Sequence, residues 1–512
     1  MKNIHIKLFI TLFCLGFLLS CKKELDIQSR NSLSSTLVLV NKTGVNSSLN
    51  SIYSVLKTER LYGRDLFSVA EAMADVAFAN GRSSRLLAEN RNTSGSNMNN
   101  WGPPVPITST IGTSYSALNE VNLVLEALPN IADATPAEKA NFEGELKFLR
   151  ALYHFDLVKN YAYIPTYIVP AQDRGGIVLS TRGFNNPDSA KLYYPKRSTI
   201  AECYDHIMSD LYASASLLSA THRGLNYASK RAALALGSRV ALYQGNWARA
   251  DSFATEAITA TGIGVMTNVT NYTTGWRAKD HPEAIFQVWF ASLAENLGVN
   301  TSLASTHTTL ASLGGFAGVR QGQGDLVPNA FLLGQLGISG FPGTLVTSNN
   351  PPPTLTYSPD VRNTLFEWGA NASGRYVECT KWMGKAGGPN WDNTVVLRVP
   401  ELYLNRAEAR YQSGNEAGAV DDLNFILTNR IVGYVIPSVP LTGQALLDEI
   451  LKQRMLEFAF EGYRFYDLKR YGLTITKTSP VVSLPPTDFR LLPRIPQSEV
   501  DGNVNMVQNF GY

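Results

Sequence analysis

The chain has 512 residues, of which 44% are hydrophobic and 17% charged, and this globular composition excludes a disordered or collagen-like protein. Its 45 basic and 42 acidic residues leave a formal charge of +3, which provides no electrostatic footprint for nucleic-acid binding. The length is compatible with roughly two to four ordinary domains, or with one large body that carries insertions.

Residues 1–20 have the form of a secretory signal peptide. Lys2 and Lys7 precede an apolar run over residues 8–19, which is too short to span a bilayer. The run ends in Leu-Leu-Ser-Cys21, which is similar to the bacterial lipobox, whose cysteine is acylated and becomes the new N-terminus. We therefore expect a lipid anchor at Cys21 and a short polar tether over residues 21–36. The alternative is an ordinary signal peptide followed by a chance cysteine.

Apolar residues recur at helical spacing along both ends of the chain and predict an all-α body. At one helix start, Thr135 has the properties of an N-cap residue and Pro136 follows at the first helical position. The predicted helices cover residues 37–56, 65–80, 115–128, 135–161, 199–218, 229–244, 247–260, 400–413 and 416–429.

Two pairs of these helices are similar to each other. In both, residues 241–248 and residues 409–417, a tyrosine precedes a tight Gly-Asn turn, and small residues stand where the helices would cross. Pairs of this kind stack into tetratricopeptide-like solenoids. We therefore predict a superhelix of helical pairs, divided into an N-terminal region over residues 37–260 and a C-terminal region over residues 396–512.

The texture changes between these regions, over residues 261–395, where Gly, Thr, Ser, Asn and Pro dominate and helical periodicity lapses. A loop of this length inside a compact protein is usually functional or disordered. The many aromatic residues argue against disorder. We predict an irregular, ligand-binding insertion that contains short strands and folds onto the helical body.

Familiar motifs of catalysis are missing from the sequence. It has no His-Glu-x-x-His, no Gly-x-Ser-x-Gly, and its Gly322-Gln323-Gly324 lacks the third glycine of a dinucleotide fingerprint. We therefore predict no catalytic, metal or cofactor site. Cys203 and Cys379 remain after Cys14 leaves with the signal and Cys21 is acylated. The sequence leaves open whether they pair or are buried thiols.

One charged segment, residues 453–472, could carry chemistry. Glu457 and Glu461 are four residues apart and would share a helix face, and an enzymatic interpretation makes them paired carboxylates for sugar hydrolysis. However, Arg454 lies three residues before Glu457, and Arg464 three before Asp467. Arginine neighbours keep carboxylates ionised, which works against a general acid. We therefore predict a structural, ion-paired helix over residues 454–467.

These segments, in this order, resemble the SusD/RagB family of surface nutrient-binding lipoproteins. The segment that follows Gln453 fits the family pattern Glu-Phe-x-x-Glu-Gly-x-Arg-x-x-Asp-Leu-x-Arg, and Phe510 departs from the family, which often has proline there. The other matching segments are the lipobox at Cys21 and residues 145–158, 163–165, 230–243, 398–409, 492–499 and 508–512.

The resemblance implies a body of tetratricopeptide-like helical pairs and a binding site on the irregular loops. It also implies an outer-membrane location facing the cell surface, and a partner, a SusC-type TonB-dependent transporter over which the protein sits as a lid. Many family members bind oligosaccharides and some bind peptides. The shared segments belong to the scaffold, so the resemblance does not identify the ligand.

Sugar recognition uses aromatic faces and planar polar groups, and the irregular region is rich in both. Our main hypothesis is a non-catalytic oligosaccharide-binding protein. The alternatives are a peptide-binding family member and, less favoured, a surface glycosidase. For each tryptophan, ordinary packing is the competing interpretation. The candidate ligand-binding residues are Trp101, Tyr272, Trp276, Arg277, Trp368, Asn390, Trp391 and Asp392.

Overall fold

The computed structural model describes residues 39–92, 107–186, 192–219, 223–260, 264–310, 320–341, 352–370, 375–385, 387–478 and 481–512, with only the backbone for 107–113. The longer helices are α3 (Lys42–Val55), α4 (Asp65–Met73), α6 (Ile107–Ala127), α7 (Pro136–Tyr161), α9 (Ile200–Leu217), α10 (Lys230–Gln244), α11 (Trp247–Thr259), α16 (Val399–Gln412), α17 (Glu416–Arg430) and α18 (Gly443–Glu457).

Short helices and strands complete the fold. The short helices are α5 (Leu87–Arg91), α12 (Tyr272–Gly275), α13 (Gly298–Thr301), α14 (Leu303–His307), α15 (Ala330–Gln335), α19 (Arg464–Arg470) and α20 (Gln497–Gly502), with 3₁₀ turns η2 (Leu128–Asn130), η3 (Leu293–Glu295), η5 (Val361–Leu365) and η6 (Phe489–Leu491). The strands are β1 (Ala77–Ala79), β2 (Ala284–Val288), β3 (Leu326–Pro328), β4 (Ile338–Ser339), β5 (Thr356–Tyr357), β6 (Phe366–Trp368), β7 (Val377–Cys379) and β8 (Thr394–Arg398).

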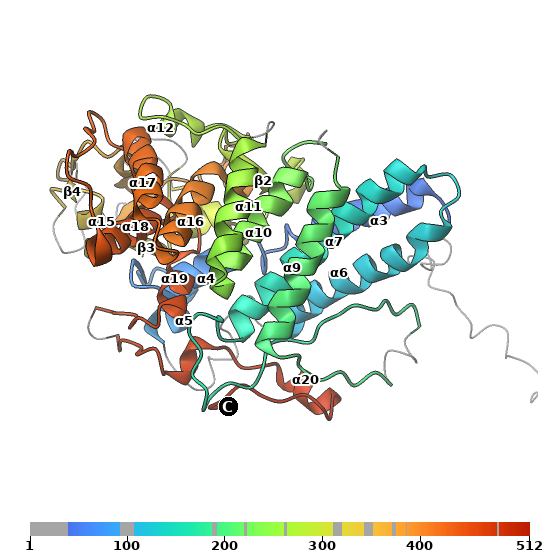
Figure 1. Ribbon diagram of the computed structural model, residues 1–512. Coiled ribbons are helices and arrows are strands. Elements are labelled where there is room, and N and C mark those ends of the chain that lie inside the picture. The colour runs from blue at the N-terminus through green and yellow to red at the C-terminus, as the bar shows by residue number, and fades with distance from the viewer. Residues whose placement is uncertain are drawn as a thin grey trace, which may run out of the picture.

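The long helices form one continuous row. Along it, α3 contacts α6, then come α7, α9, α10, α11 and α16, and α16 packs against both α17 and α18 (Figure 1). Helices α11 and α16 touch each other directly, although some 140 residues separate them in the chain, from Thr259 to Val399. The irregular region therefore leaves the row and returns to it without interrupting the packing. Whether the row is a tetratricopeptide-like superhelix stays a prediction.

Local sequence signals account for several helix boundaries. Thr135 and Glu138 form a reciprocal capping box at the start of α7, as the sequence predicts. Between α10 and α11, Gly245 adopts a left-handed conformation (φ 74°) and the Asn246 side chain accepts a hydrogen bond from the Arg249 N–H. The Gly-Asn turn thus ends one helix and caps the next, which makes the two helices antiparallel neighbours.

The predicted helix over residues 65–80 is wrong beyond Met73. There α4 ends, and β1 follows and pairs with β3. The backbone carbonyl groups at the end of a helix lack partners within the helix. Here, side chains from distant parts of the chain supply hydrogen bonds: Asn90 and Lys477 both donate to the Ala72 oxygen. Neither partner is recognisable from the local sequence.

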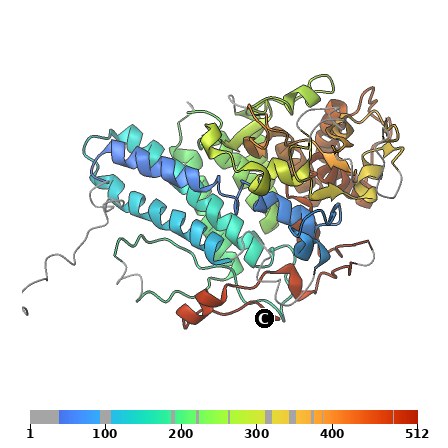
Figure 2. The same cartoon turned by 180° about the vertical axis from the view of Figure 1, so that it is seen from behind.

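The irregular region is tied down by a buried pair of strands. Every residue of β2 and β8 is buried, and the two strands pair antiparallel at the two ends of the region. Both strands contact α10, so the ends of the region are held against the helical row. Figure 1 places α12, α15 and β4 at the α16–α18 end of the molecule, and Figure 2 shows the same end from behind.

Candidate functional site

A cluster of buried charges lies beneath the irregular region. Four cations and four carboxylates form a connected set of ion pairs, so its net charge is zero. We call it the ion cluster. Its members are Asp360, Arg362, Lys381, Arg398, Arg430, Glu283, Glu457 and Glu461.

Arg398, the last residue of β8, holds the ion cluster together. Its guanidinium lies 2.6 Å from a Glu457 oxygen, 2.8 Å from a Glu461 oxygen and 3.2 Å from a Glu283 oxygen. Burial works to raise the pKa of Glu457, but Arg430 and Arg398 outweigh it and hold that pKa well below its ordinary value. A carboxyl group in this state cannot act as a general acid near neutral pH.

The carboxylates of residues 454–467 are ion-paired, as predicted, but Glu457 pairs with Arg398 and Arg430 and not with Arg454, and the single helix predicted over these residues is wrong. Helix α18 ends at Glu457, and α19 begins at Arg464. Between them Phe460 and Gly462 have φ values of 64° and 77°, a left-handed turn that breaks the helix. Glu457 and Glu461 therefore meet through Arg398 and not along a helix face.

The other charged residues between 454 and 467 form ion pairs with partners that the sequence did not predict. Arg464 binds Asp75 through two hydrogen bonds of 2.8 Å, and Arg454 lies 3.3 Å from Asp467. Arg454 and Asp467 belong to a second buried group with Arg470 and Glu408. The charged residues join separate parts of the chain, which is a structural role.

Two candidate ligand residues, Tyr272 and Trp276, are fully buried beside the ion cluster. The Arg430 guanidinium lies 4.5 Å from the centre of the Tyr272 ring, and the Lys381 ammonium lies 5.0 Å from that of Trp276. Both side chains have 0% exposure. A ring without an exposed face cannot stack on a sugar, so in this structure these aromatic residues shield buried cations.

Arg277 and Trp368 hold segments of the irregular region in place. Arg277 donates to the carbonyl and the hydroxyl of Thr380. Trp368 is 7% exposed, and its indole N–H donates to the Pro353 carbonyl at 2.8 Å. Both contacts fix the fold of the loops that they join. A ligand-binding role for these two residues stays a prediction.

The remaining described candidates lie together in one tight turn before β8. Asp392 accepts hydrogen bonds from the backbone N–H groups of Gly384 and Lys385, which closes the turn. Gly384 has φ 78°, and a Cβ there would lie 2.3 Å from the Gly388 oxygen, so only glycine fits. The turn presents Asn390 and Trp391 at its far end.

Trp391 is half-buried and firmly oriented. Its indole N–H donates to the Phe290 carbonyl at 2.9 Å, which places the ring beside the segment that follows β2. Asn390 reaches in another direction and donates to the Gln321 carbonyl. The ring is therefore fixed before any ligand arrives, which reduces the entropy lost on binding.

Three further residues border this turn and are not among the sequence candidates. Trp289 is 38% exposed, and the Lys279 ammonium lies 6.0 Å from its ring centre. Asn296 donates to the Pro389 carbonyl and so ties the segment after β2 to the turn. The one feature of the sequence that could have identified Trp289 as a candidate is its position directly after the apolar strand. We call Lys279, Trp289, Asn296, Asn390 and Trp391 the indole surface.

Two residues singled out in the sequence, Cys21 and Trp101, lie outside the described residues. Cys203 and Cys379 are free and buried, and burial raises the pKa of Cys203 to about 11. Within the described ranges, no group of three or more His, Cys, Asp or Glu residues could hold a metal ion. No helix in the same ranges is both long and apolar enough to cross a membrane.

Two protein-family models match the chain. One, described as starch-binding and associating with the outer membrane, matches residues 24–242, and the other, the SusD family, matches residues 353–512. The chain belongs to the SusD/RagB family. Neither model covers residues 243–352, which include Tyr272, Trp276 and Trp289, so the likeness to these models does not extend to most of the irregular region.

Individual relatives of the family agree. The SusD-like protein P38 of Formosa agariphila is 24% identical over 100% of this chain and 99% of its own. The starch-binding protein SusD of Bacteroides thetaiotaomicron is 32% identical over a shorter stretch, 23% of this chain and 21% of its own.

Solved structures of the family share the fold. A SusD superfamily protein of Bacteroides thetaiotaomicron has a TM-score of 0.75 at 24% identity, and the match covers 92% of this chain and 100% of that one. A protein of Bacteroides vulgatus described as a putative sugar binding protein has a TM-score of 0.74 at 24% identity, with 92% and 99% covered. The SusD/RagB fold thus accounts for the mainly helical architecture.

Proposed function

We propose that this protein binds oligosaccharide at the indole surface, without cleaving it, and passes it to an outer-membrane transporter. The observation that carries the proposal is Trp391, an indole that is part-exposed and yet fixed by its hydrogen bond to the Phe290 carbonyl. The names of the relatives, starch-binding and sugar-binding, support the same class of ligand.

The chemistry of the indole surface suits a sugar. An exposed indole offers an apolar face to the C–H groups of a pyranose ring, and amide and ammonium groups can bond its hydroxyls. Trp289 and Trp391 supply the rings, and Asn296 and Lys279 the polar groups. All of them stand on loops that the buried β2–β8 pair anchors, so the surface is rigid where it meets the ligand.

Hydrolysis is disfavoured by the state of the carboxylates that the sequence singles out. Glu457 and Glu461 are buried and bound to Arg398, so they are not available to a ligand as a free acid–base pair. The relatives are also described as binding proteins. We therefore propose a binding role, with turnover left to other proteins.

Binding specificity is tested by presenting the purified mature protein to an array of oligosaccharides and, in parallel, to peptide mixtures. We expect one class of oligosaccharide to be retained and the peptides not. Retention of peptides without any glycan would contradict the sugar assignment and favour a peptide-binding family member, while leaving the family membership intact.

The proposed partner is a SusC-type TonB-dependent transporter, and the proposed location is the cell surface, with the acyl chains of Cys21 in the outer membrane. Both rest on the family resemblance and on the lipobox. Affinity purification of the tagged protein from detergent-solubilised outer membranes, followed by mass spectrometry, should recover a large barrel protein of that class in comparable amounts. Its absence would contradict the delivery step alone.

A further inference from the structure

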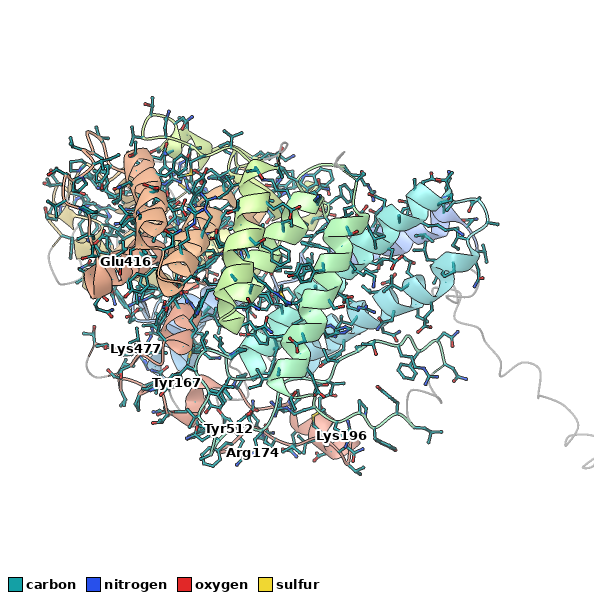
Figure 3. All side chains as sticks on the ribbon, in the orientation of Figure 1. Tyr167, Arg174, Lys196, Glu416, Lys477 and Tyr512 are labelled. Atoms are coloured by element: carbon teal, nitrogen blue, oxygen red, sulfur yellow. The ribbon has the colours of Figure 1, made fainter. Side chains whose placement is uncertain are left out.

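A cavity of about 350 Å³ is lined entirely by residues outside the irregular region. Its lining residues all fall between positions 115 and 197 or between 495 and 506, on α6, α7, the connection from α7 to α9, and α20 with the residues on either side of it. Figure 1 shows α20 along the lower edge of the molecule, and Figure 3 places Lys196 beside it. The volume lies within the range of about 300–1,000 Å³ that small-molecule sites occupy.

Aromatic rings form one wall of the cavity. Phe184 and Tyr193 pack with their ring centres 5.0 Å apart, and Tyr193 is 44% exposed, so the wall reaches the solvent. Tyr115 and Tyr161 line the interior. The wall is held in place because Asn119 both donates to the Phe184 carbonyl and accepts from its N–H.

Most polar groups of the lining are already used within the protein. The Arg197 guanidinium makes five hydrogen bonds, to the carbonyls of Gly175, Gly176, Tyr161 and Val507 and to the Asn509 side chain. The Tyr115 hydroxyl donates to the Val178 carbonyl. The donors of both groups are thus used within the protein, where they hold the cavity in shape.

Two charged side chains of the lining are different. Among the described residues, the Glu499 carboxylate has no hydrogen-bond or ion-pair partner, and the Arg182 guanidinium contacts only the Phe184 ring, at 5.0 Å. Burial raises the pKa of Glu499, which is what a carboxyl group without a partner experiences. Glu499 and Tyr115 line the same cavity.

We propose that this cavity binds one neutral sugar residue, with its ring against Tyr193 and Phe184 and its hydroxyls bonded to Glu499 and Arg182. A carboxylate only accepts hydrogen bonds and a guanidinium only donates them, whereas a sugar hydroxyl does both. The two charged groups that remain available, Glu499 and Arg182, have opposite signs, whereas the donors of Arg197, the other charged group of the lining, are bonded within the protein, and this favours a neutral ligand over an ionic one. The assignment to carbohydrate rests on the proposed function, but the site is separate from the indole surface.

The methyl group of Met506 reports on the cavity, and that of Met383 serves as a reference outside it. Met506 lines the cavity, and Met383 lies beside Arg277 in the irregular region, with its sulfur 3.3 Å from the guanidinium. The experiment titrates the mature protein, labelled with ¹³C at the methionine methyls, with glucose, galactose, mannose, xylose and N-acetylglucosamine in turn, and with the charged sugars glucuronate and glucosamine for comparison. We expect at least one of these sugars to shift the Met506 resonance in a saturable way.

Matched variants then test which residues bind. Tyr193→Ala and Glu499→Gln should each weaken the Met506 titration about tenfold, because each removes one of the ligand's main contacts. Tyr194→Ala is the control for the first, since Tyr194 is 43% exposed and adjacent but not in the lining. Asp501→Asn on α20 is the control for the second. Both controls should titrate as the wild type does.

The possible outcomes separate this site from the proposed function. A Met506 resonance that no sugar moves, or that moves equally in wild type, Tyr193→Ala and Glu499→Gln, overturns the cavity site. A response to glucuronate or glucosamine but to none of the neutral sugars overturns the neutral ligand. Failure of oligosaccharide binding at the indole surface, with the Met506 response intact, would contradict the proposed function and leave the cavity site standing.

Discussion

Three carboxylates from distant parts of the chain meet on the guanidinium of Arg398. Glu283 precedes β2, while Glu457 and Glu461 flank the end of α18. All four side chains are buried, so each charge depends on its partners for the stabilisation that water would otherwise provide. Removing one partner leaves uncompensated charge in the interior, which costs far more than the same change at the surface.

Replacing one member of the ion cluster should therefore strongly destabilise the protein. Glu461→Ala leaves Lys381 and part of Arg398 unpaired, and we expect a loss of about 3–5 kcal/mol in the free energy of unfolding. Thermal unfolding followed by circular dichroism measures it. The control is Glu256→Ala, which removes an exposed ion pair with Lys230 and should change the melting temperature little. Equal melting temperatures for the two variants would contradict the structural role.

Glu71 gives a stability change that depends on pH. Burial raises its pKa from 4.5 to about 7, although the Gly462 N–H and Lys381 work in the opposite direction and Glu461 adds to the rise. Between pH 4.5 and 7 the folded protein keeps a proton that the unfolded chain has lost, so stability falls as the pH rises through this window. Above it, the ionised carboxylate costs on the order of 3 kcal/mol.

A neutral replacement should remove that cost. Glu71→Gln keeps an oxygen for the Gly462 N–H, and we expect it to be more stable than the wild type at pH 8 and no more stable at pH 4.5. Differential scanning calorimetry at both pH values gives the two melting temperatures. If the melting temperatures of variant and wild type differed by the same amount at pH 4.5 and at pH 8, Glu71 would not titrate in this range.

Single residues also show what sequence reasoning can and cannot find. Trp276 and Trp391 both stand among polar residues and look equally available in the sequence. Trp276 is buried because Lys381 and Arg398, more than 100 positions away, come to lie over its ring. Trp391 stays part-exposed at the end of a tight turn. Contacts made across such distances leave no local pattern to read.

At the scale of elements, prediction succeeds where the signal is local. The start of α7 follows from Thr135, Pro136 and Glu138, and the α10–α11 turn from Gly245 and Asn246. It fails at the end of α18, where tertiary contacts and not propensity set the boundary. There the Gly462 N–H donates to Glu71 of α4, which holds the chain in a turn against that helix.

The turn after α18 should tolerate no side chain at Gly462. The residue has φ 77°, and a Cβ would lie 2.9 Å from the Leu66 oxygen and the Phe67 Cα. Gly462→Ala should therefore cost about 2–3 kcal/mol, from backbone strain and overpacking together. Gly414 has nearly the same φ, 78°, with no atom within 4 Å, so Gly414→Ala measures the strain alone. Urea unfolding of the pair gives the difference, and equal losses would mean that the close packing at Gly462 contributes nothing.

The whole molecule consists of a helical row that carries an irregular region at one end. The row follows from periodicity and the family resemblance, and the direct contact of α11 with α16 explains how some 140 residues can intervene without disturbing it. The indole surface could be predicted only in part, through Asn390 and Trp391. Trp289 joins it through the antiparallel pairing of β2 and β8, which brings the two segments together.

The proposed membrane anchor concerns the whole protein and would depend on one residue, Cys21. Cys21→Ala in the expressed precursor should move the protein from the membrane fraction to the soluble fraction, because no acyl chains can then be attached. Immunoblots of fractionated cells measure the distribution, and mass spectrometry of the mature N-terminus shows the acyl groups. An unchanged distribution, with no acyl mass on the wild type, would contradict the anchor.

Oligosaccharide binding by the fixed indole of Trp391 is tested most directly by calorimetry with a glycan retained on the array. We expect Trp391→Ala to bind it about tenfold more weakly than the wild type, since a stacked ring contributes at least about 1.4 kcal/mol. Tyr212→Ala, which removes a 44% exposed ring on α9, should bind with unchanged affinity. Wild-type affinity in folded Trp391→Ala and Trp289→Ala variants would contradict a sugar site at the indole surface.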